Sequence, residues 1–305
     1  MTHRDDVAAA AAAQQGLVEE YDAAVKERDD LGTALVKAQD ELAATKAALA
    51  ACQAGTGSGA PITTDVPSGW RVTITENFDI SCADKAAFDA TYPSRGIKRY
   101  PDHYPDTRTN QGKTDGGYYN APIRVTGGVL KIEMDVVNGK ARVGAIVPVP
   151  TATGTWGDSP GVIVEERSRF TLDPGFKAAH LLWPQSNKSN PDGEIDYPEF
   201  NGPAGPVSAF IHYQNPTTSG EQKAIGTTID PRQWHTYRTV WKMGQSVAFY
   251  CDGALISPTW TARVPATPMH IVLQNETILG TGTVGPGASA KGLVETDWIR
   301  VMVPA

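Results

Sequence analysis

From Trp70 to the C-terminus, apolar and polar residues alternate in short runs, which restricts this part of the chain to a fold built from β-strands. Asn138-Gly139 and Asp252-Gly253 separate some of these runs and favour tight hairpins. No stretch after Trp70 has the period of an amphipathic helix of about ten or more residues. The runs are Arg71–Thr75, Gly128–Val137, Ala141–Val149, Gly161–Leu172, Ala178–Trp183, Gly193–Phe200, Val207–Gln214, Trp234–Met243, Ser246–Cys251, His270–Glu276 and Glu295–Val303. They predict an all-β domain: a sandwich of two antiparallel sheets with a core large enough to be stable alone.

The composition changes near residue 55 and divides the chain into three parts. Residues 1–54 contain 17 Ala, no Pro and one aromatic residue, Tyr21, whereas the other 23 aromatic residues lie at or after Trp70. Between them lies Gly55-Thr-Gly-Ser-Gly-Ala-Pro61, a flexible linker of the Gly/Ser type. We therefore expect an N-terminal segment, 1–54, a linker, 55–69, and a β-sandwich domain, 70–305.

Residues 17–52 carry a heptad pattern typical of an α-helical coiled coil. Mostly small or apolar residues recur in alternating steps of four and three, and charged residues flank them. The positions are Leu17, Tyr21, Ala24, Arg28, Leu31, Leu35, Ala38, Leu42, Thr45, Leu49 and Cys52. We expect this segment to join copies of the chain into a homo-oligomer, a dimer or a trimer. The alternative is a single Ala-rich helix that lies on the domain or on a larger assembly.

Charge and hydropathy exclude several classes of protein. The formal net charge is −7 and there is no block of five Lys or Arg residues, so binding of nucleic acid through phosphate neutralisation is not expected. No stretch of 18 apolar residues predicts a transmembrane helix. Asp5 and Asp6 stand where a secretion signal would be basic, so no standard signal peptide is expected.

The three cysteines, Cys52, Cys82 and Cys251, are too widely and irregularly spaced for a disulfide scaffold or a metal motif. Cys82 and Cys251 either pair in an oxidising compartment or are buried free thiols.

Three carboxylates lie within six residues of one predicted strand, Gly193–Phe200. Glu194 and Asp196 share a face because strand side chains alternate. Glu199 is five positions from Glu194 and would face the other way in a regular strand. One extra residue, a β-bulge, returns it to the first face, and Pro198 lies in that interval, where proline is tolerated. The spacing therefore predicts that all three carboxylates converge.

Two converging carboxyl groups are the machinery of a retaining glycosidase. One attacks the anomeric carbon, and the other protonates the leaving oxygen and later activates water. A third carboxylate between them raises the pKa of its neighbour and can share a proton with the nucleophile. The alternative is a solvated acidic strand face or a calcium site.

The signature Glu194-x-Asp196-x-x-Glu199 resembles the active-site strand of glycoside hydrolase family 16. The resemblance extends in family order to His180–Pro184, Phe210–Tyr213, Trp234–Trp241, Val247–Gly253 and Thr296–Val301. It implies a concanavalin-like jelly roll with a sugar-binding cleft. It also implies Glu194 as nucleophile, Glu199 as acid/base and Asp196 as assisting carboxylate, with β-1,3 and β-1,4 glucans or galactans as substrates. Tyr197-Pro198 replaces the two apolar residues usual in the bulge.

Four further residues are candidates for substrate binding. Trp183 precedes the signature and can stack on a sugar ring or pack in the core. By family position His212 contacts substrate or Asp196, although a strand histidine is often a core residue. Gln274 and Asn275 lie on a strand expected beside the site, where amides suit hydroxyl groups or satisfy a buried backbone. No cofactor is required; bacterial members of the family often hold a structural calcium ion, for which no ligands can be named here.

A glycan-cleaving head on an oligomerising helix, with no signal peptide, is typical of a bacteriophage virion protein assembled in the cytoplasm and released on lysis. We therefore expect a retaining endo-β-glycosidase on a capsid or tail, with other virion proteins as partners and a host polysaccharide as substrate. Secretion by a non-classical route is the alternative location. The alternative functions are a lectin-like adhesin or decoration module that binds glycan without cleaving it, and a purely structural virion protein.

Overall fold

The computed structural model describes residues 65–101, 121–149, 159–203, 205–218, 220–278 and 285–305, together with scattered positions between 15 and 39. The chain divides into two compact units, Met1–Ala50 and Ala51–Ala305. In the first unit the described positions are helical, and Tyr21, Leu31 and Leu35 of the predicted heptad pattern expose more than half of their surface in the single chain. Most of the heptad positions and most of the linker lie outside the described residues. Among the described residues, no helix is long and apolar enough to cross a membrane.

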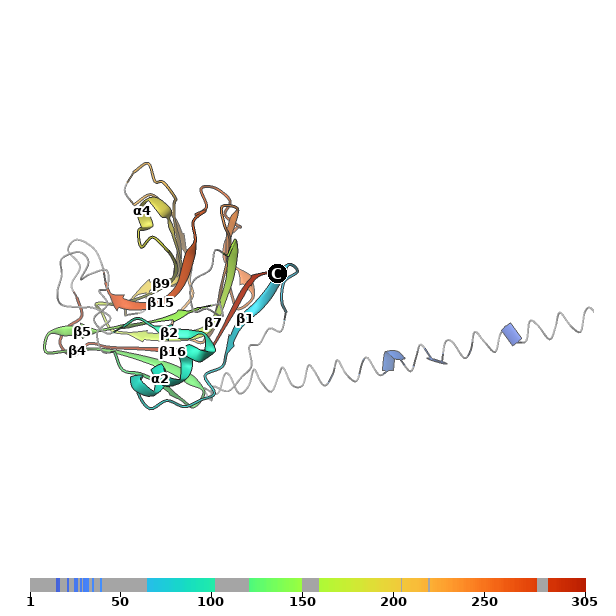
Figure 1. The fold of residues 1–305 in the computed structure, drawn as a ribbon, viewed down its shortest axis with the longest axis horizontal. Coiled ribbons are helices and arrows are strands. Elements are labelled where there is room, and N and C mark those ends of the chain that lie inside the picture. The colour runs from blue at the N-terminus through green and yellow to red at the C-terminus, as the bar shows by residue number, and fades with distance from the viewer. Residues whose placement is uncertain are drawn as a thin grey trace, which may run out of the picture. The chain divides into compact units, whose positions relative to one another are not determined.

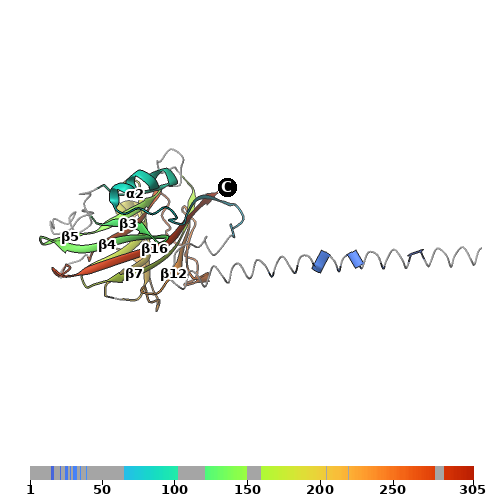
Figure 2. The same ribbon diagram turned by 90° about the horizontal axis from the view of Figure 1, so that it is seen from below.

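The second unit is a sandwich of two antiparallel sheets (Figure 1). The larger sheet has nine strands in the order β14-β13-β12-β7-β16-β4-β3, with β1 paired to β16 and β5 paired to β4. Figure 2 shows β4, β16, β7 and β12 side by side. The strands are β1 (Trp70–Glu76), β3 (Ile123–Thr126), β4 (Val129–Val137), β5 (Lys140–Arg142), β7 (Gly161–Leu172), β12 (His235–Lys242), β13 (Ser246–Cys251), β14 (Ala254–Leu255) and β16 (Lys291–Pro304).

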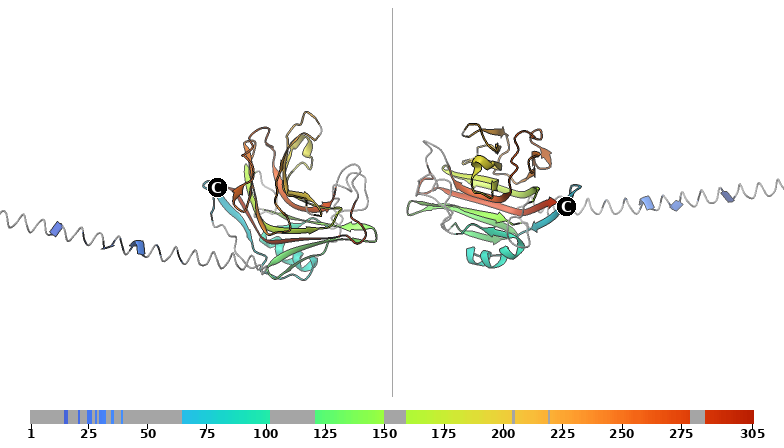
Figure 3. Two further views of the ribbon diagram at one scale, coloured as in Figure 1. Left: turned by 180° about the vertical axis from the view of Figure 1, so that it is seen from behind. Right: turned by 45° about the horizontal axis from the view of Figure 1, so that its top comes forward.

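The smaller sheet has seven strands in the order β11-β10-β9-β8-β15-β6-β2. Two further views show it curving over the larger sheet (Figure 3). The strands are β2 (Ile97–Arg99), β6 (Gly144–Pro148), β8 (Phe176–Pro184), β9 (Glu194–Asn201), β10 (Ser208–His212), β11 (Gln222–Gly226) and β15 (Met269–Thr277). A short helix, α4 (Ser189–Asp192), connects β8 to β9.

The alternating pattern correctly located the long strands. Each of the eleven predicted runs contains or overlaps an observed strand, and two antiparallel sheets form as expected. Asn138 and Gly139 have φ of 53° and 75°, and Asp252 and Gly253 have φ of 48° and 81°, so both predicted hairpin turns use left-handed backbone. The predicted run Ala141–Val149 covers β6 and part of β5. The strands that the pattern missed are β2, β3, β11 and β14. They have two to five residues, which is too short to display an alternation.

The core lies between the sheets and is built from the apolar face of each long strand. Trp241 is almost completely buried there, and its Nε1 donates to the carbonyl of Pro265 at 3.1 Å. The buried polar side chains between the sheets include Glu166, which lies with Oε1 2.5 Å from Nδ1 of His180 and accepts a hydrogen bond from Ser168 Oγ.

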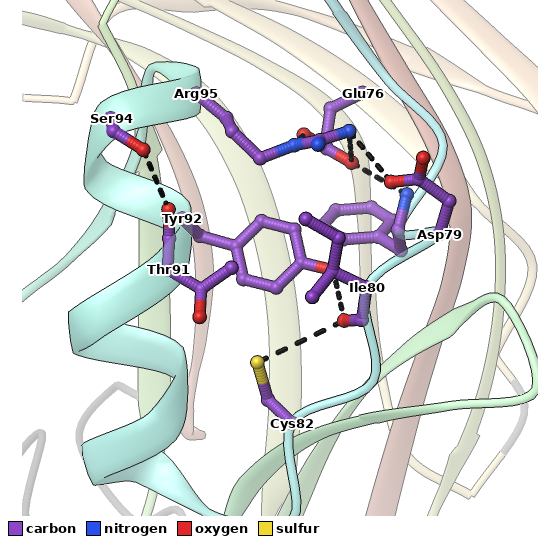
Figure 4. Close-up of polar contacts among 9 residues, drawn as sticks. Glu76, Asp79, Ile80, Cys82, Thr91, Tyr92, Ser94 and Arg95 are labelled. Carbon is purple, nitrogen blue, oxygen red and sulfur yellow. Dashed lines mark hydrogen bonds and ion pairs between the residues drawn. The ribbon is translucent and has the colours of Figure 1, made fainter.

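A helical corner, α2 (Lys85–Thr91) followed by the 3₁₀ helix η1 (Tyr92–Arg95), packs near β3 (Figure 4). The hydroxyl of Tyr92 donates to the carbonyl of Ile80 at 2.6 Å, and the guanidinium of Arg95 bridges Glu76 and Asp79. Cys82 lies beside this corner, with Sγ 3.8 Å from the same Ile80 carbonyl. Cys82 and Cys251 are both buried and free, so the free-thiol alternative describes this structure.

Candidate active site

The carboxylate strand β9 contains the predicted bulge. Asp196 stands opposite Phe210 and Glu199 stands opposite Ser208 on β10. The chain therefore advances three residues along β9 while it advances two along β10. The pairing of β9 with β8, its neighbour on the other side, shows the same shift in register. The extra residue lies in the interval that contains Pro198, and it returns Glu199 to the face of Asp196.

Packing of Tyr197 shows which face of β9 this is. Its ring lies 5.6 Å from the ring of Tyr237 and 5.3 Å from that of Phe249, both on the larger sheet. Tyr197 therefore points into the core, and its neighbour Asp196 points to the outer face of the smaller sheet. The side chains gathered on this outer face around β9 are called the carboxylate site below.

Glu194, Asp196 and His212 come together at the carboxylate site. One donor atom from each lies within 4.8 Å of the others. His212 stands opposite Glu194 in the β9–β10 ladder, and its Nε2 lies 3.2 Å from Asp196 Oδ2, an ion-pair distance without the alignment of a hydrogen bond. Asp196 is 2% exposed. The expected contact between His212 and Asp196 is therefore present.

Burial and like charge perturb both carboxyl groups in the same direction. Burial, followed by the charge of Asp196, raises the pKa of Glu194 well above its usual range. Burial, followed by the charge of Glu199, raises the pKa of Asp196 well above its usual range. Because two adjacent buried carboxylates repel each other, the Glu194–Asp196 pair holds a proton more tightly than either group would alone.

Two residues at this site, Lys177 and Glu276, were missed by the sequence analysis. Nζ of Lys177 lies 2.8 Å from Glu199 Oε1 and 3.5 Å from Glu276 Oε1. Burial alone would lower the pKa of Lys177, but the carboxylates of Glu276 and Glu199 raise it above its ordinary value. Lys177 and Glu276 are directly opposite each other on β8 and β15, a register that the sequence does not reveal.

The remaining candidates for substrate binding divide between the outer face and the core-facing side of the smaller sheet. Trp183 is only partly buried and its Nε1 donates to Asn187 Oδ1 at 3.2 Å. Gln274 stands opposite Ala179, which in turn stands opposite Glu199, so Gln274 shares the outer face.

The prediction for Asn275 is wrong. Its side chain follows Gln274 directly, so it points to the opposite face of β15. It is 0% exposed, and neither polar side-chain atom has a hydrogen-bond partner among the described residues. Asn275 is therefore a core residue in this structure.

His270 and Tyr100 extend the polar part of the outer face. His270 stands opposite Trp183, and its Nε2 lies 3.5 Å from the hydroxyl of Tyr100. Burial lowers the pKa of His270 to about 4, so its imidazole is neutral near pH 7 and suited to hydrogen bonding with hydroxyl groups. Tyr100 belongs to the polar and aromatic stretch before β3, of which residues 102–120 lie outside the described part.

A cation could be held at the carboxylate site by Glu194, Asp196 and His212, whose donors are the oxygen and nitrogen ligands that divalent metals use. The structure offers no test of the structural calcium ion that the family resemblance raised, which stays a prediction.

Comparison with known proteins agrees with this geometry. Residues 165–300 match the model of the family described as Glycosyl hydrolases family 16. A search of the curated proteins finds no significant sequence match. The matched segment contains the carboxylate strand and most of the strands on either side of it.

Solved structures share the fold at low sequence identity. An endo-1,3-beta-glucanase from Streptomyces sioyaensis aligns with a TM-score of 0.58 and 16% identity, covering 80% of this chain and 99% of that one. A pseudo beta-1,3-glucanase and immunostimulatory antigen of Mycobacterium tuberculosis aligns with a TM-score of 0.56 and 17% identity, covering 77% and 99%. A GlcNAcα1-4Gal-releasing endo-β-galactosidase from Clostridium perfringens aligns with a TM-score of 0.56 and 15% identity, covering 80% and 66%. The second unit of this chain therefore has the jelly-roll fold of the family-16 glycosidases.

Proposed function

We propose that the chain is a family-16 glycoside hydrolase that cleaves a β-linked polysaccharide internally with retention of configuration. The observation that carries this proposal is the convergence of Glu194, Asp196 and Glu199 on one face through the bulge in β9. Like charges so close together destabilise a fold, and they are typical of sites where carboxyl groups do chemistry.

In the first step a carboxylate oxygen of Glu194 attacks the anomeric carbon, and the bond from that carbon to the leaving oxygen breaks. Glu199 gives its proton to the leaving oxygen. In the second step Glu199 takes a proton from water, the water oxygen bonds to the anomeric carbon, and the ester to Glu194 breaks. Asp196 shares a proton with Glu194 in the resting site and keeps it while Glu194 acts as the nucleophile.

Glucans or galactans with β-1,3 or β-1,4 linkages are the proposed substrates. The relatives in this fold include both glucanases and a galactosidase, so the sugar itself is left to experiment. Trp183 offers an aromatic face to a sugar ring, and His212 and Gln274 offer hydrogen bonds to hydroxyl groups.

In our proposal the N-terminal segment forms a coiled coil over residues 17–52. This coiled coil joins copies of the chain into a homo-oligomer, each copy carrying one β-sandwich domain. Exposed Tyr21, Leu31 and Leu35 on helical positions support it, because large apolar side chains at heptad spacing are buried when helices pair. A virion protein acting on the host cell surface is the biological setting that this architecture favours.

The second candidate is a glycan-binding module that does not cleave. It is favoured by Lys177, whose ammonium group lies 2.8 Å from Glu199 Oε1. This ion pair engages the carboxyl group that the hydrolase would use as its proton donor. One solved structure that shares this fold is described as a pseudo beta-1,3-glucanase.

Reducing-sugar release from a panel of β-glucans, galactans and bacterial envelope glycans tests the proposal. Wild type should release sugar from one class of glycan, and Glu194→Gln should lower the rate by at least ~10³-fold because the nucleophile is lost. Glu133→Gln, on β4 of the other sheet, is the matched control and should keep the wild-type rate. Proton NMR of the first product should show the β-anomer, as retention requires.

Binding measured on the same panel separates the two candidates. Glycan binding by both wild type and Glu194→Gln, with no sugar release by either, would replace the hydrolase by the binding module. Release that persists unchanged in Glu194→Gln would remove Glu194 from its proposed role.

A further inference from the structure

A second cluster of metal-binding side chains lies on the larger sheet, away from the carboxylate site. His235 begins β12, and Cys251 ends β13 at the same end of the β12–β13 ladder, next to Asp252. Nδ1 of His235 lies 2.6 Å from Asp252 Oδ2, and Sγ of Cys251 lies 3.7 Å from the same oxygen. One donor atom from each of the three residues lies within 4.8 Å of the others.

We propose that His235 Nδ1, Cys251 Sγ and Asp252 Oδ2 bind a zinc ion. A thiolate, an imidazole and a carboxylate are the three ligand types that zinc takes in proteins, and three protein ligands leave a fourth position for water. The side chain of Asp252 is 55% exposed, so solvent and an incoming ion reach this position. The cluster needs contraction around the ion, because a tetrahedral site has ligand bonds of about 2.0–2.3 Å.

Neighbouring groups already orient two of the ligands. The backbone N–H of Thr236 donates to Asp252 Oδ1 at 2.8 Å, which directs Oδ2 towards His235 and Cys251. The ring of Tyr237 stands edge-on at 5.9 Å from the imidazole of His235. Such supporting contacts fix the orientation of metal ligands in known sites.

Tyr197 supplies a second observation that points to a thiolate. Its hydroxyl is buried, has no hydrogen-bond partner among the described residues, and lies near the thiol of Cys251. A thiolate bound to zinc would give this hydroxyl a charged acceptor. A buried polar atom that gains a partner in this way favours the metal-bound state.

The ion replaces the thiol proton in this cluster. Burial, followed by the carboxylate of Asp252, raises the pKa of Cys251 to about 12, so without a metal the sulfur carries its proton at neutral pH. When zinc binds, the sulfur–zinc bond forms, the S–H bond breaks and the proton leaves to solvent. His235 binds the ion through Nδ1 as the neutral imidazole, with its ring hydrogen on Nε2. Binding therefore links the start of β12 to the β13–β14 turn and stabilises this edge of the sheet.

Cobalt substitution tests the site directly, because only a thiolate ligand gives a sulfur-to-cobalt charge-transfer band. The full chain is freed of metal and titrated with Co²⁺ and then with Zn²⁺. Cys52→Ser/Cys82→Ser should keep the band, and Cys251→Ser should lose it. Cys82 is a matched control, since it is also a buried free thiol, yet its described polar contact is the carbonyl of Ile80 (Figure 4).

Zinc affinity gives the second measurement. Competition with a chromophoric chelator should show binding by wild type that is roughly 100-fold weaker in His235→Gln and in Asp252→Asn. These two variants keep the proposal testable if Cys251→Ser fails to fold. The absence of a charge-transfer band in wild type, its persistence in Cys251→Ser, or unchanged zinc affinity in both other variants would overturn the site. None of these readouts depends on glycan cleavage.

Discussion

The two sheets of the sandwich arrange charge on their outer faces in opposite ways. On the larger sheet, Glu165 of β7 stands opposite Arg238 of β12 and Arg300 of β16. It accepts a hydrogen bond from Nε of each, at 2.5 Å and 2.7 Å, so every charge in this group faces its opposite. On the smaller sheet the carboxylate site gathers Glu194, Asp196, Glu199 and Glu276 around Lys177 and His212.

The contrast separates charged groups that stabilise the fold from charged groups that we propose take part in catalysis. Cross-strand pairs of opposite sign lower the free energy of a sheet, whereas like charges side by side raise it. The second arrangement gives carboxyl groups whose pKa values are raised well above their ordinary range. In our proposal the larger sheet is a platform, and the outer face of the smaller sheet carries the chemistry.

The largest expected loss of stability comes from breaking the paired group. Glu165→Gln keeps the shape of the side chain but leaves two guanidinium groups opposite a neutral amide. We expect it to lower the free energy of unfolding by about 3–5 kcal/mol in urea denaturation. Glu133→Gln, which removes the carboxylate from an exposed pair with Arg124, should cost less than about 1 kcal/mol. Equal losses in the two variants would remove the distinction between buried and exposed pairs.

A smaller loss is expected when the carboxylate site loses Lys177. Lys177→Met removes an ammonium group that contacts both Glu199 and Glu276, so their repulsion is no longer offset. We expect about 1–3 kcal/mol less stability near neutral pH. Lys131→Met, on the larger sheet and 3.5 Å from Glu295, is the control and should change stability little.

Glu276→Gln added to Lys177→Met should restore part of the loss, because it removes one of the repelling charges. Failure of this rescue would mean that the lysine acts through packing rather than charge.

The sequence predicted the long strands and the bulge because both follow from the period of two. Glu199 is an odd number of residues from Glu194, so a regular strand would place the two on opposite faces. Pro198 marks where the extra residue lies, so the local sequence was sufficient to predict that Glu194, Asp196 and Glu199 converge. Lys177 and Glu276 were missed because they are far apart in sequence and meet only through the β8–β15 register. That register depends on how complete strands pack.

The error at Asn275 has a different origin. The strand was predicted correctly, but Gln274 and Asn275 are adjacent and cannot share one face. The alternation rule would have excluded one of them, and only the register with Ala179 and Ala178 shows which. The pairing of His235 with Asp252 likewise needs the turn geometry at Asp252, whose φ is 48°.

The smallest expected effect is a difference of sign in how stability depends on pH. Burial raises the pKa of Asp196 above the ordinary 3.8, so the stability that this group contributes is fully present below about pH 4 and is lost as the pH rises towards the folded-state pKa. The hydrogen bond from Arg142 lowers the pKa of Asp135, so its contribution is present above about pH 4 and is lost at lower pH. Asparagine at either position cannot titrate. The Tm of Asp196→Asn relative to wild type should therefore increase from pH 4 to pH 8, whereas that of Asp135→Asn should decrease from pH 2 to pH 5. For the Asp135–Arg142 pair the change in the free energy of unfolding should be less than about 1 kcal/mol. Slopes of the same sign would show that the two sheets treat their carboxylates alike, and the division between platform and active face would fail.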